Sequence, residues 1–192
     1  MFKNIKKLAA IGVIASILVA NVGVVAFAAV DPAPKAVVTG GSLGIADLGV
    51  ADFTPATLDG TTKIINATVT PVTLTDATGT GNGWSVTLKA SKITNATAKN
   101  IALNTLSDDS LVLGTVSVAA VGDSTPITNI VTTTGAINND LGIEVLKAGT
   151  NEGMGKYTIS MEPMALTLLP KEAKAGTYTS TLTVTLTSGP AA

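Results

Sequence analysis

The stretch that decides the fold is Gly79-Thr80-Gly81-Asn82-Gly83-Trp84-Ser85-Val86-Thr87-Leu88, where alternating apolar and polar residues follow a glycine-rich turn. Glycine accepts positive φ values, so this turn can present the indole at the first inward position of a strand. The alternation predicts Trp84, Val86 and Leu88 on a core face, with Ser85, Thr87 and Lys89 outside. Aromatic residues make up only 3% of the chain and Trp84 is its only tryptophan. A buried anchor is favoured over a surface-binding aromatic.

Outside this stretch the chain consists of short runs of Thr, Val, Ile and Leu separated by Gly, Asn, Asp and Pro. This pattern is typical of many short strands joined by turns, and no helix is predicted. Two runs shift phase by one residue at a proline, residues 63–75 at Pro71 and residues 157–168 at Pro163. Such a shift indicates a bulge or a strand that crosses from one sheet to another. Further strands are predicted at residues 111–119, 127–132 and 142–146.

The final predicted strand shows the clearest alternation. Its core face carries Tyr178, Ser180, Leu182, Val184 and Leu186, and its other face carries the threonines from 177 to 187. Threonine is favoured on a solvated strand, and regularly spaced hydroxyls also offer a hydrogen-bonding platform for a glycan or another strand. The patterns together predict an all-β fold, namely a two-sheet β-sandwich of Ig-like or related Greek-key arrangement.

The N-terminus has the pattern of a cleaved secretory signal peptide, residues 1–28. Three lysines precede an apolar run at residues 8–20, and Ala26-Phe27-Ala28 fits a signal-peptidase site. The apolar run is short for a membrane span, so we expect no stable span after processing. Residues 29–40, which include Pro32 and Pro34, are predicted to form an extended leader. One domain, residues 41–190, follows it.

The composition excludes most catalytic mechanisms. The chain has no histidine, cysteine or arginine, which removes Ser-His-Asp and Cys-His catalysis and zinc sites built on imidazole or thiolate. We therefore expect no enzyme activity, no catalytic residues, no cofactor and no metal. Asp108-Asp109 and Asn139-Asp140 could supply oxygen ligands to calcium, but neither matches the spacing of a calcium loop, and polar turns are favoured.

The net charge of the processed chain predicts little electrostatic attraction to anionic partners. Cleavage after Ala28 would leave 164 residues with nine lysines and 13 acidic residues, a net charge of −4. A mildly acidic surface without arginine argues against nucleic acid as a partner and against anionic lipid.

Two segments resemble the motifs of the WxL family of Gram-positive cell-surface proteins. The first motif of that family is Trp-x-Leu after a glycine-rich turn, and here Trp84-Ser85-Val86 has valine in place of leucine. The second motif is Tyr-x-x-x-Leu-Thr-Trp-x-Leu followed by proline. Here it is represented by Tyr178, Leu182, Thr183, Val184, Leu186 and Pro190, with valine in place of tryptophan. Residues 153–157 and 173–178 are also similar to family segments.

The resemblance implies a secreted protein of the cell wall or cell surface that is held non-covalently. It implies peptidoglycan or another cell-wall glycan as the ligand and a WxL-interacting surface protein as a partner. The motif residues are then core anchors or wall-binding residues: Trp84, Val86, Leu88, Tyr178, Leu182, Val184 and Leu186. A second hypothesis is a structural subunit of a surface fibre or coat, in which the leader completes the sheet of a neighbour by β-strand addition.

Overall fold

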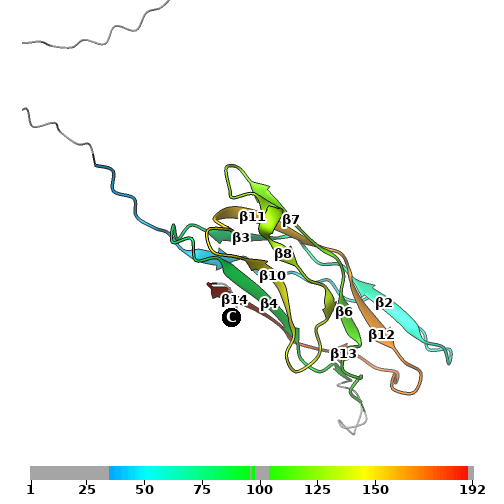
Figure 1. Cartoon of the computed structure of the whole chain (residues 1–192). Coiled ribbons are helices and arrows are strands. Elements are labelled where there is room, and N and C mark those ends of the chain that lie inside the picture. Colours follow the sequence, from blue (N-terminus) through cyan, green and yellow to red (C-terminus); the bar gives the residue numbers. More distant parts are fainter. Residues whose placement is uncertain (1–34, 96, 98–103, 190–192) are drawn as a thin grey trace, which may run out of the picture. The chain divides into compact units, whose positions relative to one another are not determined.

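Short strands in antiparallel sheets make up the part of the chain that is described, residues 35–95, 97 and 104–189 of a computed structural model (Figure 1). These residues contain no α-helix, which confirms the all-β prediction. The predicted signal peptide lies outside the described residues. Of the predicted leader, residues 35–40 are exposed and have no regular secondary structure. The described residues from Val38 onward belong to one compact unit.

Four sheets contain the strands. The sheet β1-β3-β11-β7 consists of β1 (Leu43–Ile45), β3 (Val72–Asp76), β11 (Gly155–Met161) and β7 (Val116–Val121). The sheet β2-β12-β6-β9 consists of β2 (Lys63–Ala67), β12 (Met164–Leu168), β6 (Leu111–Leu113) and β9 (Gly135–Ala136). The sheet β14-β4-β10-β8 consists of β14 (Leu182–Ser188), β4 (Trp84–Ala90), β10 (Ile143–Ala148) and β8 (Val131–Thr132). The two-stranded sheet pairs β13 (Tyr178–Thr179) with β5 (Thr94–Asn95).

Three segments of the chain cross from one sheet to another. The chain passes from β2 to β3 through Pro71 and from β11 to β12 through Pro163, as the phase shifts predict. The predicted strand 111–119 is divided at Gly114 into β6 and β7, which lie in different sheets. A Cβ at Gly114 would lie 2.8 Å from the Cβ of Glu162 and 2.9 Å from the carbonyl oxygen of Pro163. Two crossings therefore pack against each other, and glycine makes room for the contact.

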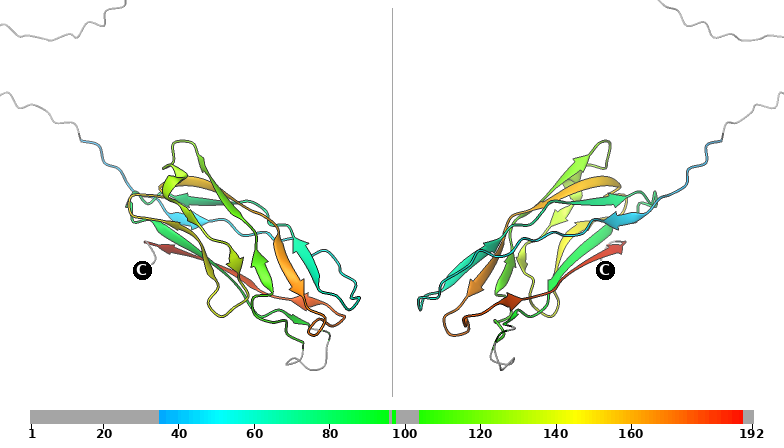
Figure 2. Two further views of the ribbon diagram at one scale, coloured as in Figure 1. Left: turned by 45° about the vertical axis from the view of Figure 1, so that its right-hand side comes forward. Right: turned by 180° about the vertical axis from the view of Figure 1, so that it is seen from behind.

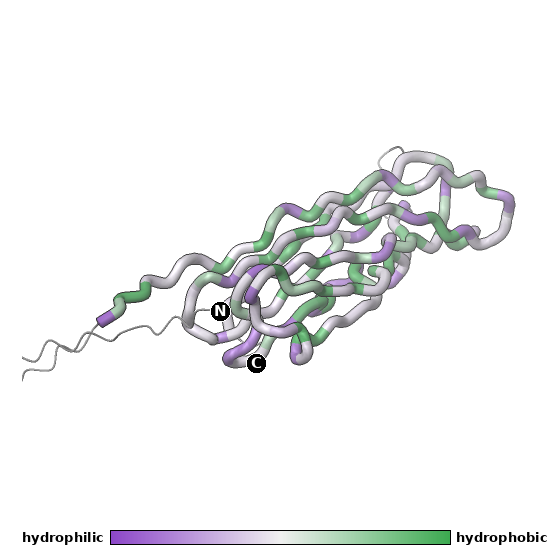
Figure 3. The backbone as a smooth tube through the Cα atoms, turned by 90° about the horizontal axis from the view of Figure 1, so that it is seen from above, coloured by the Kyte–Doolittle hydropathy of each residue, from purple (hydrophilic) through white to green (hydrophobic). Residues whose placement is uncertain are grey.

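One set of buried side chains joins the three larger sheets. Leu74 and Tyr157 come from β3 and β11, Leu166 comes from β12, and Val86 comes from β4. Hydrophobic and hydrophilic residues alternate along parts of the chain (Figure 3), and strands such as β3 and β12 direct one face to this core. Burial of one large apolar side chain contributes roughly 1.5–3 kcal/mol. The sheets are therefore held together chiefly by side-chain packing rather than by backbone hydrogen bonds from one sheet to the next.

Two of the shorter predicted strands have different outcomes. The strand predicted at 142–146 corresponds to β10 (Ile143–Ala148), which begins one residue later. The strand predicted at 127–132 is wrong over its first half, because Ile127–Asn129 forms a 3-10 turn after Pro126 and only Val131–Thr132 is a strand. The turn is closed by the Ile130 N–H, which donates to the Ile127 carbonyl at 2.9 Å. The local turn therefore outweighs the strand preference of these residues.

A buried tyrosine generates a test of the core. Tyr157 is 0% exposed, and its hydroxyl donates to the carbonyls of Thr125 and Met154, which lie at 2.9 and 3.0 Å. Burial raises the pKa of Tyr157, so the hydroxyl remains a donor at neutral pH. We expect Tyr157→Phe to lower the free energy of unfolding by about 1–3 kcal/mol, because the Thr125 carbonyl loses this donor and the Met154 carbonyl keeps only the Thr125 N–H. Urea denaturation followed by tryptophan fluorescence measures this loss.

The matched control is Tyr178→Phe, which removes the hydroxyl of the other, half-buried tyrosine. Its oxygen accepts one hydrogen bond from the Lys174 N–H, so we expect a loss below about 1 kcal/mol. An unaltered denaturation midpoint for Tyr157→Phe would contradict the assigned role of the buried hydroxyl.

Candidate functional site

The two motif segments form neighbouring antiparallel strands, β4 and β14. Val86 pairs with Leu186 and Leu88 pairs with Val184, although the partners are about 100 residues apart in the sequence. On β4 the structure buries Trp84, Val86 and Leu88, each no more than 1% exposed. On β14 the structure places three half-buried side chains against the same core: Leu182, Val184 and Leu186. Six of the seven predicted residues thus share the inner face of one strand pair.

Trp84 is completely enclosed. Its side chain is 0% exposed, and its indole N–H donates to the Gly153 carbonyl at 2.8 Å. Its ring lies 6.1 Å from the ring of Tyr157, with a tilt of 59°. Gly153 has a φ of +69°, and a Cβ there would lie 2.4 Å from the indole nitrogen. The indole therefore contacts protein atoms on all sides and presents no surface to a ligand.

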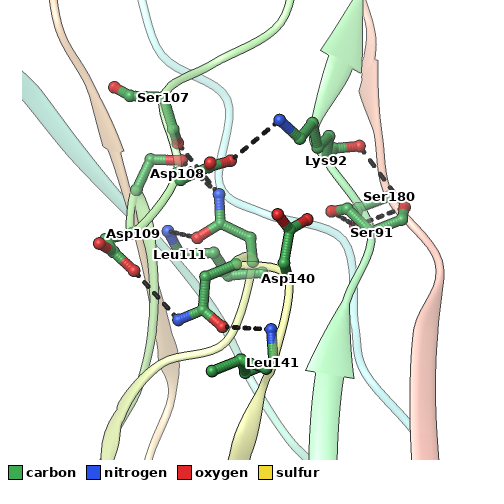
Figure 4. Close-up of polar contacts among 12 residues, drawn as sticks. Ser91, Lys92, Ser107, Asp108, Asp109, Leu111, Asp140, Leu141 and Ser180 are labelled. Atoms are coloured by element: carbon green, nitrogen blue, oxygen red, sulfur yellow. Dashed lines mark hydrogen bonds and ion pairs between the residues drawn. The ribbon is translucent and has the colours of Figure 1, made fainter.

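The seventh predicted residue, Tyr178, lies in β13 and pairs with β5 instead of β4. The single final strand predicted from Tyr178 to Leu186 is thus wrong at Ser180 and Thr181, where it is interrupted. Ser180 is exposed rather than on the core face. Its hydroxyl lies beside Ser91 (Figure 4) and donates to the Ser91 carbonyl at 2.7 Å. The Thr181 N–H donates to the Ser91 hydroxyl at 2.9 Å. These side-chain bonds replace part of the regular ladder, in which the Ser91 N–H still donates to the Thr181 carbonyl.

The outer side of the same strand pair carries a row of exposed threonines. Thr183, Thr185 and Thr187 of β14 are exposed, and Thr185 pairs with the half-buried Thr87 of β4. We call these four residues the threonine face. Their hydroxyls provide both donors and acceptors at the regular spacing of adjacent strands.

Ser85 departs from the predicted pattern. It was expected outside with Thr87 and Lys89, but it is only 4% exposed. Strand β4 lies between β14 and β10, so Ser85 is flanked by the larger residues Thr187 and Lys147. A small side chain on an inner strand is covered by its neighbours even on the outward face.

A groove opens between two segments that lie far apart in the sequence. One wall is formed by residues 50–58 and the other by residues 173–182, and the groove has a volume of about 900 Å³. We call it the seam groove. Its walls include Tyr178 and Leu182, and its floor is aliphatic: Leu111, Met164, Leu166 and Leu168. The walls are mostly irregular chain, which gives no periodic signal in the sequence.

Comparison with known proteins gives the family of this chain. The model of a family described as a WxL domain, surface cell wall-binding, matches residues 36–190. This chain belongs to the WxL family. The match includes both motif strands, the threonine face and the seam groove. No curated protein and no solved structure matches the chain significantly.

The family description makes the WxL chain a surface protein that binds cell wall. In the residues that the structure describes, no helix is long and apolar enough to cross a membrane.

Two carboxylates of the WxL domain that suggested calcium, those of Asp108 and Asp109, are engaged in local contacts. Asp108 lies 3.7 Å from the Lys92 ammonium, and Asp109 accepts a hydrogen bond from the Asn139 side chain at 3.1 Å (Figure 4). The Asn139 side-chain oxygen accepts from the Leu141 and Gly142 N–H groups. Among the described residues, no group of three or more metal-ligating side chains is present. These contacts support the interpretation as polar turns.

One carboxylate fixes a wall of the seam groove. Glu172 precedes the wall segment 173–182, and its carboxylate accepts hydrogen bonds from the hydroxyl and the N–H of Ser107. The Ser107 hydroxyl, followed by its N–H, lowers the pKa of Glu172 from its ordinary value of 4.5. The tether therefore favours the ionised form of Glu172.

We expect Trp84→Ala to lower the free energy of unfolding by about 3–5 kcal/mol, because it leaves a cavity and removes the ring contact with Tyr157. Circular dichroism during chemical denaturation measures the change. The matched control is Ile64→Ala, at a residue that is 65% exposed, for which we expect less than about 0.5 kcal/mol. Normal stability combined with loss of wall binding would instead assign the indole to a binding site.

The Glu172 tether should respond to pH with a defined sign. Since the folded-state pKa is lowered, the tether stabilises the fold above the ordinary value of 4.5 and is lost as pH falls through the lower folded value. We expect the Ser107 amide resonance to titrate with a midpoint below 4.5 and to lose this transition in Glu172→Gln. A midpoint at or above 4.5 would refute the tether.

Proposed function

We propose that this WxL chain is exported and associates non-covalently with the peptidoglycan of a Gram-positive cell wall. The observation that carries the proposal is the match of a surface cell wall-binding family over residues 36–190. The signal-peptide pattern of residues 1–28 supports secretion. The lack of histidine, cysteine and arginine in the sequence supports a binding role without catalysis.

In this proposal the wall-binding domain, residues 41–190, is a two-sheet β-sandwich of Ig-like or related Greek-key arrangement. Two observations support it. Trp84 of β4 packs on Tyr157 of β11, so the two sheets face each other across the core. The crossings at Pro71, Gly114 and Pro163 join two small sheets along three neighbouring segments, as expected for one bent layer.

We assign the wall contact to the threonine face. Glycan strands carry hydroxyl and amide groups, and threonine hydroxyls complement both because each can donate and accept. A net acidic domain gains little from charge at an anionic wall, so neutral hydrogen bonding is the chemistry that remains. In this proposal the motif residues support the threonine face from the core side. The residues that anchor β4 and β14 to the core are Trp84, Val86, Leu88, Leu182, Val184 and Leu186, and Tyr178 anchors the adjoining β13.

A second candidate function is favoured by the seam groove. A groove with an aliphatic floor beside edge strands fits assembly of a surface fibre or coat by β-strand addition. The resemblance also supports a WxL-interacting surface protein as a partner. Either protein contact would use a surface other than the threonine face, so wall binding and protein binding are separable by mutation.

The wall contact is tested with the double variant Thr183→Val/Thr185→Val. Valine keeps the β-branched shape and removes the hydroxyls, so the strand should persist while peptidoglycan affinity falls about tenfold, as expected for two lost hydrogen bonds. The assay is sedimentation with purified peptidoglycan freed of wall proteins and teichoic acids.

The matched control is Thr115→Val/Thr134→Val, at two exposed threonines outside the threonine face. We expect this control to sediment like the unaltered chain. Equal sedimentation of the Thr183/Thr185 variant would move the wall contact elsewhere. Complete recovery of the unaltered chain in the supernatant would reject peptidoglycan as the ligand.

A further inference from the structure

Within the described residues the outer edge of β14 is unpaired, although β1 lies close to part of this strand. The Thr181 carbonyl accepts from the Ser91 N–H and the Gly189 N–H donates to the Gly83 carbonyl, so odd-numbered residues of this segment direct their backbone groups toward β4. In an antiparallel ladder the intervening residues direct theirs the opposite way, which applies to Leu182 and Val184. In the part of the chain that the structure describes, no strand pairs with this side of β14. Leu182 brings this open edge to the seam groove.

The opposite wall of the seam groove is an extended segment that runs beside β2. The Ala51 N–H donates to the Thr68 carbonyl at 2.9 Å, and the Thr54 N–H donates to the Asn66 carbonyl at 3.0 Å. The groove therefore lies between an open strand edge and an extended segment, above a floor of leucine and methionine side chains. This geometry provides backbone partners on one wall and pockets for alternate side chains, which are the two requirements for β-strand addition.

A segment with the matching chemistry precedes the first strand. Val37 and Val38 are 92% and 91% exposed, the highest values among the exposed large hydrophobic residues of the described chain. Residues 35–39, Lys-Ala-Val-Val-Thr, contain no proline, so every residue can donate to a ladder, whereas Pro32 and Pro34 mark the limit of such a strand. Lys35 also complements Asp52 on the groove wall.

The segment that would be added and the groove wall that would receive it have the same length. Residues 35–39 and the wall from Tyr178 to Leu182 each comprise five residues, about 17 Å of extended chain.

The chain that follows this segment is held away from the start of the groove. The Gly41 N–H donates to the Ala77 carbonyl, and the groove begins near Val50, which bridges Val69. Ala77 and Val69 are separated by the whole of β3 and by the change of sheet at Pro71. Figure 2 shows the same separation, with β1 and β2 toward opposite ends of the domain.

We propose that residues 35–39 of one copy add as a strand to the seam groove of a second copy, pairing with the open edge at Leu182. The proposal rests on the assembly candidate above and is independent of the threonine face. The added segment and the groove that receives it are different parts of the chain, so the contact is heterologous and head-to-tail. Repetition of such a contact builds an open chain of copies rather than a closed dimer.

The first test is size-exclusion chromatography with light scattering on the exported chain over a range of concentrations. We expect a mass that rises with concentration, and a monomer for Val37→Asp/Val38→Asp at every concentration. These residues lie outside the core, so the double variant should keep the melting temperature of the unaltered chain. A monomeric unaltered chain, or a double variant that still assembles, would overturn the proposal.

The second test locates the contact by cross-linking. The chain has no cysteine, so Val38→Cys and Thr179→Cys can be introduced into separate preparations. On mixing and mild oxidation, we expect a disulfide-linked heterodimer of these two variants. The control pairs Val38→Cys with Thr115→Cys, at an exposed residue away from the groove, and should give much less product. Equal yields for the two pairs would refute the assigned contact.

The tests also distinguish other outcomes. Peptidoglycan sedimentation of dilute Val37→Asp/Val38→Asp should match the unaltered chain, so failure of assembly and failure of wall binding are separate results. If the unaltered chain stays monomeric while a WxL-interacting protein protects residues 173–182 from hydrogen exchange, the groove belongs to that partner and self-assembly is refuted.

Discussion

The fold depends on satisfying one buried N–H. Trp84 is 0% exposed, and an indole donor without an acceptor in such a site costs several kcal/mol. The acceptor is the carbonyl of Gly153, 69 residues away, in a backbone conformation with a φ of +69° that leaves no room for a Cβ. Two residues later begins β11, which carries Tyr157 against the indole. A single hydrogen bond thus sets the glycine turn, the start of β11 and the spacing of two sheets.

Side chains, rather than a continuous ladder, unite the sheets around this point. The chain changes sheet at Pro71, at Gly114 and at Pro163, and each change interrupts the backbone ladder. Proline suits such a site because it donates no hydrogen bond. Gly114 suits it because Glu162 and Pro163 approach within 3 Å of where its Cβ would lie. Breaks in the ladder are tolerated because the leucine, valine and isoleucine core continues across them.

The local sequence pattern was sufficient to predict most strands. The features that it did not predict depend on contacts between residues far apart in the sequence. Period-two alternation was sufficient for the burial of Val86 and Leu88 and for the sheet changes at both prolines. It could not show that Ser91 interrupts the final strand, because that contact joins residues 89 apart. Ser85 was misplaced for the same reason, since neighbouring strands cover it. The seam groove was missed because its walls, residues 50–58 and 173–182, are mostly irregular chain.

Strand β14 shows how a chain with few aromatics and little charge can still present several contacts. Its inward side chains, Leu182, Val184 and Leu186, pack against the core, while its outward side chains are threonines. Its third direction, the backbone edge, opens to the seam groove at Leu182. Hydroxyls and backbone groups both form directional hydrogen bonds without a net charge. One strand can therefore anchor to the core, present hydroxyls outward and accept another strand, because these tasks use its two opposite faces and its backbone edge.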